Sequence, residues 1–117
     1  MKIVVVSGGF DPIHSGHIAY FKSAKKLGDK LIVALNSDKW LINKKGKFFM
    51  PFEERSTIIK NLAMVDEVID FEDDEFGSAS HALIKIKESY PNDEIIFCNG
   101  GDLSLIHISE PTRQFRI

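Results

Sequence analysis

Apolar residues occur along this 117-residue chain in short runs that alternate with segments of helical spacing. The first run, from Met1 to Val6, is rich in β-branched residues and predicts a buried strand. Apolar side chains between Ile18 and Leu27 then recur at helical spacing, which predicts a helix that begins near Gly16. The later periodicities predict strands at residues 30–36, 66–71 and 94–98, and helices at residues 52–64 and 79–89.

This order of elements predicts an α/β fold, a Rossmann-like three-layer α/β/α arrangement around a parallel sheet. In such folds, ligands bind at the carboxyl ends of the strands. Glycine, asparagine and aspartate gather after three of the predicted strands, at residues 8–9, 36–38 and 100–102. Residues 43–47 are predicted to form a flexible basic loop, and the acidic run at residues 72–75 a solvated loop without a metal.

The segment from Ser7 to His17, SGGFDPIHSGH, carries the most specific chemistry in the chain. A glycine pair follows the first strand, and His14 and His17 stand three residues apart where the helix begins. N–H groups at the helix start and the helix dipole favour an anion there, and both imidazoles can donate to it. The simpler interpretation is that each histidine is a helix cap or a surface residue.

Better-known glycine and histidine motifs fit this segment less well. No glycine after Gly9 completes the G-x-G-x-x-G pattern of dinucleotide-binding proteins, and no Gly-Lys-Ser/Thr follows as in a P-loop. His-x-x-His also lacks the i, i+4 spacing and the nearby glutamate of zinc protease helices. The sequence therefore predicts phosphate binding at this turn.

The composition is typical of one globular domain, because 44% of the residues are hydrophobic and the net charge is −2. No apolar run approaches the roughly twenty residues that span a bilayer, and the N-terminus does not resemble a secretory signal. The single cysteine, Cys98, lies in an apolar run and is expected to be a strand residue. These features favour a cytoplasmic protein with no membrane partner.

Charge is unevenly distributed along the chain. Residues 22–60 hold ten Lys or Arg and four Asp or Glu, whereas residues 66–102 hold two Lys and eleven Asp or Glu. A basic half beside the segment from Ser7 to His17, called the histidine turn below, suits a polyphosphate ligand. Solvated helix faces explain several of the lysines equally well. Because aromatic residues do not alternate with arginines, we expect no nucleic-acid partner.

The histidine turn resembles the signature of the cytidylyltransferase-like nucleotidyltransferases, the His-x-Gly-His superfamily. Later segments resemble the family in order and spacing: residues 27–38, residues 52–55 with 65–69, and residues 99–102. The resemblance covers residues 1–102, and it is greatest to glycerol-3-phosphate cytidylyltransferase and to the nucleotidyltransferase domain that makes ADP-heptose.

The resemblance implies an enzyme that transfers CMP or AMP from CTP or ATP to a small phosphorylated alcohol or sugar, with release of pyrophosphate. It also implies Mg²⁺ as cofactor and a homodimer. The implied catalytic residues are His14, His17, Lys44 and Lys47. The implied nucleotide-binding residues are Gly8, Gly9, Phe10, Asp11, Gly16, His17, Asn99, Gly101 and Asp102.

Two of the implied residues have open assignments. Asp38 and Arg55 are implied substrate-binding residues, and an exposed ion pair on a helix surface is the alternative for Arg55. Asp11 is the nearest carboxylate for the shell of the metal ion, and its alternative role is to cap the turn. The protein itself is expected to ligate no metal apart from this Asp11 option.

The C-terminal residues 103–117 are expected to be a non-native tail, which leaves residues 1–102 as a truncated nucleotidyltransferase domain. The run from Leu103 to Arg113 matches one translation frame of a common sequencing-library adapter, and its alternative is an ordinary strand that ends at Pro111. The family's arginine and Gly-Ile-Ser-Thr-like segment has no match there, so we expect this chain to be weakly active or inactive.

Two functions of other classes remain open. One is a non-catalytic nucleotide-binding or dimerisation module. The other is a fragment of a tRNA ligase that shares the histidine turn, and it would require a much longer chain. The choice between CTP and ATP and the identity of the phosphorylated acceptor are also open.

Overall fold

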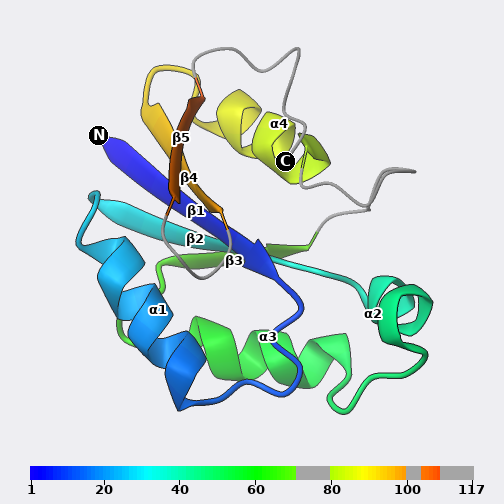
Figure 1. The fold of residues 1–117 in the computed structure, drawn as a ribbon. Coiled ribbons are helices and arrows are strands. Elements are labelled where there is room, and N and C mark those ends of the chain that lie inside the picture. Colours follow the sequence, from blue (N-terminus) through cyan, green and yellow to red (C-terminus); the bar gives the residue numbers. More distant parts are fainter. Residues whose placement is uncertain (71–79, 100–103, 109–117) are drawn as a thin grey trace.

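The fold is built on one sheet, described by a computed structural model that covers residues 1–70, 80–99 and 104–108. The strand order is β3-β2-β1-β4-β5 (Figure 1). The parallel strands are β1 (Lys2–Gly8), β2 (Lys30–Leu35), β3 (Glu67–Asp70) and β4 (Glu94–Asn99). The fifth strand, β5 (Ser104–Ile108), runs antiparallel to β4 at the edge.

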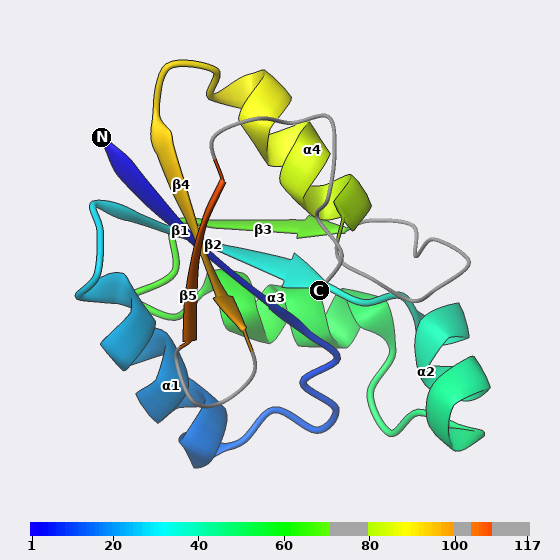
Figure 2. The ribbon, with the colours of Figure 1, turned by 45° about the horizontal axis from the view of Figure 1, so that its top comes forward.

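Helices cover both faces of this sheet. One face is covered by α1 (Ser15–Lys25) and α3 (Phe52–Lys60), and the other by α4 (Ser80–Ser89), as both views show (Figures 1 and 2). A fourth helix, α2 (Asp38–Lys45), lies outside these layers, past the carboxyl end of β2 (Figure 1). The predicted three-layer α/β/α fold is therefore confirmed.

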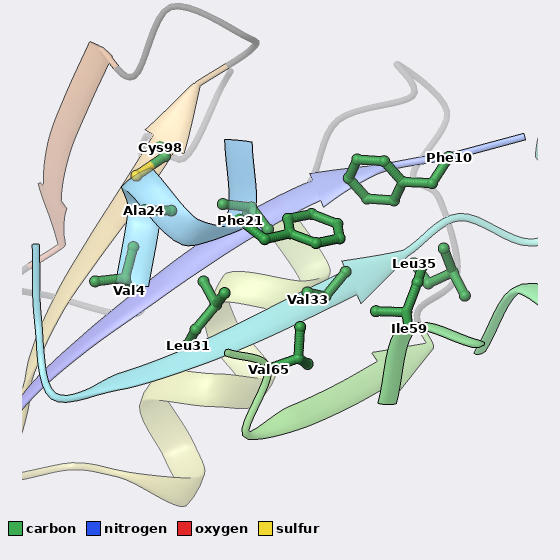
Figure 3. Packing of buried hydrophobic residues seen from close by; sticks show 11 residues of the cluster. Val4, Phe10, Phe21, Ala24, Leu31, Val33, Leu35, Ile59, Val65 and Cys98 are labelled. Atoms are coloured by element: carbon green, nitrogen blue, oxygen red, sulfur yellow. The ribbon is translucent and has the colours of Figure 1, made fainter. Parts of the chain in front are cut away.

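The core has two halves because successive side chains of a strand point to opposite faces. Ile3 and Val5 of β1 are fully buried on the face that α4 covers. Val4 and Val6 are buried on the other face, where Phe21 of α1 joins the same cluster (Figure 3). Burial on both sides explains why β1, β2 and β4 are largely continuous apolar runs and show no alternation.

The predicted helix at residues 52–64 is too long, because α3 ends at Lys60. Asn61 closes the helix, and its N–H donates to the carbonyls of Ile58 and Ile59. Leu62 and Val65 still pack against the core from the turn that follows, so apolar spacing continues although the helix has ended.

The predicted flexible loop at residues 43–47 is wrong, because residues 43–45 form the last turn of α2. Ser37 caps the helix start through a hydrogen bond from the N–H of Trp40, 3.0 Å long, and Gly46 ends it in the left-handed conformation at φ 84°. Leu41 is the buried residue of α2, so no apolar stripe indicated this helix.

The parallel-sheet prediction did not include β5, an antiparallel strand within the segment expected to be a non-native tail. The backbone of residues 104–108 fits the alternative of an ordinary strand. Its origin from an adapter stays a prediction, as does the division at residue 102. No helix of the described residues is long and apolar enough to cross a membrane.

Candidate functional site

The histidine turn joins β1 to α1 at the carboxyl edge of the sheet. β1 lies between β2 and β4, and the chain leaves it on one side to β2 and β3 before it returns to β4 on the other. Ligands of open α/β sheets bind where the order of strands reverses in this way. The predicted site therefore lies at a position that the fold itself favours.

Both imidazoles are oriented by backbone N–H groups of the turn. His14 caps α1, and its Nδ1 accepts from the N–H of Gly16 at 3.0 Å. The Nδ1 of His17 accepts from the N–H of His14 at 3.1 Å, so the two side chains form a capping box. The rings are stacked with their centroids 3.8 Å apart.

This arrangement fixes which ring nitrogen can donate. Since each Nδ1 accepts a hydrogen bond, each neutral imidazole carries its proton on Nε2. Burial lowers the pKa of His17, and the neighbouring charge of His14 lowers it further. Near neutral pH, His17 is therefore an Nε2–H donor, which suits hydrogen bonding to a phosphate oxygen.

The residues around the rings leave them little freedom. Phe10, at φ 48°, packs edge-on against His17 with the ring centroids 5.0 Å apart. A side chain on Gly16 would place its Cβ 2.9 Å from Cε1 of His14, and one on Gly8 would come as close to the ring of Phe10. Gly8 and Gly16 are therefore needed for ring packing, a role that the sequence did not indicate.

Arg55 is fully buried, so the predicted alternative of an exposed surface pair is wrong. Its guanidinium donates to the carbonyls of Gly9 and Asn36, both at 2.9 Å, and to that of Met50 at 2.8 Å. It also pairs with Oδ1 of Asp38 at 2.6 Å. Arg55 thus ties together the segments that follow β1 and β2, and its binding of a substrate phosphate stays a prediction.

The carboxylate of Asp11 is also buried, and it receives donors from the segment that joins α2 to α3. Its Oδ2 accepts from the N–H of Phe49 and its Oδ1 from that of Met50, each at 2.7 Å. Burial alone would raise the pKa of Asp11, but these bonds and Lys45 hold it below its usual value. The carboxylate is therefore charged, and its predicted role in nucleotide or metal binding stays open.

The two predicted catalytic lysines lie at the end of α2 and just after it. Lys44 is exposed, with Nζ 5.1 Å from the ring centroid of Trp40. Lys47 is also exposed, and its Nζ lies 5.4 Å from the ring centroid of Phe49. Both ammonium groups are accessible to an anion, and their catalytic role stays a prediction.

Of the predicted residues Asn99, Gly101 and Asp102, the structure describes the first. Asn99 is the last residue of β4, so its backbone lies at the same edge of the sheet as the histidine turn. Gly101 and Asp102 lie outside the described residues. Among the described residues, no group of three or more His, Cys, Asp or Glu side chains could hold a metal ion.

Sequence reasoning missed two features of this site. Lys45 donates to the carbonyl of Asp11 at 2.9 Å and pairs with its Oδ2 at 3.2 Å. Gly9 lies against Leu41 of α2, because a Cβ at Gly9 would come within 2.7 Å of that side chain. The basic run at residues 44–47 was a sequence signal for the contact of Lys45 with Asp11. Nothing in the sequence indicated the contact of Gly9 with Leu41.

Together these observations define an α/β protein with two paired imidazoles in the turn between its first strand and first helix. A family profile described as cytidylyltransferase-like matches residues 5–113. The chain therefore belongs to the cytidylyltransferase-like family, as the histidine turn suggested.

Curated relatives agree with this assignment. The bifunctional protein HldE of Enterobacter sp. (strain 638) is 35% identical over an alignment of 120 positions that covers 93% of this chain and 25% of the relative. HldE of Salmonella arizonae is 34% identical with the same coverage. The chain thus spans about a quarter of the length of these relatives.

Two solved structures resemble the fold. The lipopolysaccharide core biosynthesis protein from Thermoplasma volcanium is 33% identical, with a TM-score of 0.67 over 74% of this chain and 69% of that one. A protein of unknown function from Archaeoglobus fulgidus is 20% identical, with a TM-score of 0.55 over 94% of this chain and 97% of that one. The second likeness concerns the fold alone.

Proposed function

We propose that this protein transfers a nucleoside monophosphate from CTP or ATP to a small phosphorylated alcohol or sugar and releases pyrophosphate. The observation that carries the proposal is the pair of stacked imidazoles whose Nδ1 atoms both accept backbone N–H groups. The Nε2–H groups of both rings then serve as donors to phosphate at the carboxyl edge of the sheet. Membership of the cytidylyltransferase-like family supports the same chemistry.

The reaction asks the protein for positioning and charge stabilisation. A phosphate oxygen of the acceptor attacks the α-phosphorus in line, while the bond from this phosphorus to the bridging oxygen breaks and pyrophosphate leaves. His14 and His17 donate to the phosphate oxygens on which negative charge grows. Lys44 and Lys47 neutralise the triphosphate or the incoming phosphate.

Mg²⁺ would be held mainly through phosphate oxygens and water, which is how this ion binds at many nucleotide sites. The described residues fit that arrangement, because both oxygens of Asp11 already accept hydrogen bonds from the protein. When bound, the ion would neutralise part of the triphosphate charge.

The relatives favour a sugar phosphate among the acceptors. One of them is described as a lipopolysaccharide core biosynthesis protein, and lipopolysaccharide cores are built from sugars. We further propose that the nucleotide donor is CTP or ATP, and that the protein is a homodimer in the cytoplasm. Asn99, Gly101 and Asp102 would contact the base or ribose.

Because residues 103–117 are expected to be a non-native tail, the test is a pyrophosphate-release assay on the protein with the family's C-terminal segment restored, crossing CTP and ATP with glycerol phosphate and several sugar phosphates. We expect release with one donor and one class of acceptor, and we expect His14→Ala and His17→Ala each to lower kcat by about a hundredfold or more. Lys85→Gln, an exposed change on α4, is the control and should leave kcat unchanged. Circular dichroism should show that each variant is folded.

Two outcomes would overturn the proposal. Rates like those of the wild type in both histidine variants would remove the imidazoles from the reaction. Binding of triphosphate with no pyrophosphate from any pair would favour the non-catalytic nucleotide-binding module.

A further inference from the structure

The backbone of Phe49 and Met50 is held from both sides. The two N–H groups of these residues donate to the carboxylate of Asp11, each at 2.7 Å. The carbonyl of Met50 accepts from Nε of Arg55 at 2.8 Å. The segment that joins α2 to α3 is therefore attached to the histidine turn through Asp11 and to α3 through Arg55.

Lys45 adds a third attachment, from the end of α2. Its Nζ donates to the backbone carbonyl of Asp11 at 2.9 Å and lies 3.2 Å from Oδ2 of the same residue. The side chain of Asp11 is 0% exposed, whereas that of Lys45 is 36% exposed. One buried carboxylate thus receives contacts from both ends of the segment that carries Lys44 and Lys47.

Asp38, at the start of α2, pairs with Arg55, but the end of the segment that carries the lysines has few other attachments among the described residues. α2 is eight residues long, and Leu41 is its buried residue. Lys44, Lys45 and Lys47 repel one another, and residues 42–47 are all exposed. A short, highly charged helix of this kind does not hold a fixed position without a specific anchor.

We propose that Asp11 is a positioning residue that holds the segment bearing Lys44 and Lys47 against the histidine turn. The inference rests on the proposed function, because the two lysines act on the triphosphate or the acceptor phosphate. Asp11 acts through backbone N–H groups and Lys45, and it needs no contact with substrate or metal.

Charge alone makes the opposite prediction, which gives the proposal a clear test. A carboxylate beside a polyphosphate site repels the ligand, so its neutralisation would strengthen binding if charge alone mattered. If Asp11 positions the lysines, the same neutralisation weakens binding, because one amide cannot accept from two N–H groups and from Lys45 as a carboxylate does.

The experiment compares Asp11→Asn with the wild-type chain in two measurements. Amide hydrogen exchange at one or both of Phe49 and Met50 should be about tenfold faster or more in the variant, because the amide oxygen can replace only one of the two carboxylate acceptors. The dissociation constants of CTP and ATP should rise about tenfold. Where pyrophosphate release can be measured, the KM of Asp11→Asn for the triphosphate or the acceptor should rise by a larger factor than its kcat falls.

Three further variants complete the design. Glu54→Gln removes a carboxylate from an exposed position on α3 and should change neither measurement. Lys45→Met keeps the carboxylate and its two amide bonds but removes the attachment from α2, so it should weaken triphosphate binding by a smaller factor. Lys45→Arg should restore binding. If Asp11→Asn does not fold, the comparison of Lys45→Met with Lys45→Arg still tests the proposal.

The proposal fails if Asp11→Asn binds triphosphate as well as or better than the wild type, with unchanged exchange at Phe49 and Met50. Failure of the proposed function looks different. If the wild type binds triphosphate and releases no pyrophosphate, catalysis is excluded while both measurements still test Asp11. If the wild type binds no triphosphate, exchange at the two N–H groups decides whether Asp11 holds the segment.

Discussion

His14 and His17 owe their orientation to backbone N–H groups of their own turn. The sequence predicted their closeness from spacing, because residues three apart at a helix start share one side. It could not predict that both Nδ1 atoms accept hydrogen bonds, since that depends on the extended conformation of His14 at φ −146°. The available donor atom, Nε2, therefore comes from the structure.

The titration of His17 tests this arrangement. We expect its pKa in the folded chain to lie below the usual 6.5, because burial and the charge of His14 both oppose protonation. The unfolded chain then binds more protons between the two pKa values. The contribution of His17 to stability is accordingly full above about pH 6.5 and declines as the pH falls towards the folded value.

The measurement is an NMR titration of the ring signals in the wild type and in His14→Gln. The variant should move the pKa of His17 upward while leaving it below 6.5, because burial is the larger cause. A midpoint at or above 6.5 in the wild type would contradict this account.

Arg55 shows why some roles cannot be predicted from a sequence. The sequence placed it on a helix and suggested a substrate phosphate or a surface pair. Its actual acceptors are carbonyls of Gly9, Asn36 and Met50, which lie on three other segments of the chain. Such contacts exist only after the strands and helices are packed, so no local pattern predicts them.

At the scale of elements, strands were easier to predict than helices. The predicted strands at residues 30–36 and 94–98 differ from β2 and β4 by one residue, because doubly buried strands are compact apolar runs. α2 was missed because one buried side chain anchors it, while caps and specific hydrogen bonds fix its ends. Ser37 and Gly46 are residue types typical of a helix start and a helix end, but a prediction from apolar spacing alone does not use them.

The dependence of α2 and its neighbours on Arg55 gives a prediction for this scale. Arg55→Met leaves three carbonyls without their donor and Asp38 without its ion pair, so the free energy of unfolding should fall by about 3 kcal/mol. The measurement is urea unfolding. Lys60→Met, an exposed change at the end of the same helix, should cost at most about 1 kcal/mol.

An Arg55→Met variant as stable as the wild type would show that these segments do not depend on the buried guanidinium. Loss of stability in both variants would instead indicate that any change of charge on α3 is destabilising.

At the scale of the whole molecule, positive charge is concentrated in residues 22–60, the part of the chain that includes α2 and α3. Residues 22–60 carry ten Lys or Arg, and Lys44 and Lys47 are exposed there. The alternation of strands and helices was enough to predict the layers and the ligand-binding edge. It could not predict β5, because residues 104–108 were assigned to a non-native tail.

This charge distribution predicts a salt effect on triphosphate binding. An increase in ionic strength from about 0.05 M to about 0.5 M should weaken the affinity several-fold, because exposed lysines and a polyphosphate are screened by salt. Isothermal titration calorimetry measures it. Lys44→Gln and Lys47→Gln should each flatten the dependence, whereas Lys85→Gln on α4 should not; equal slopes in all three would contradict the assignment.

The central claim is that Nε2 of both histidines donates to phosphate, and a ¹⁵N NMR spectrum of the histidine rings with and without triphosphate tests it most directly. We predict that the neutral rings of His14 and His17 carry their proton on Nε2, and that CTP or ATP shifts both Nε2 signals. Protons on Nδ1, or ring signals that stay unchanged at saturating triphosphate, would contradict the claim.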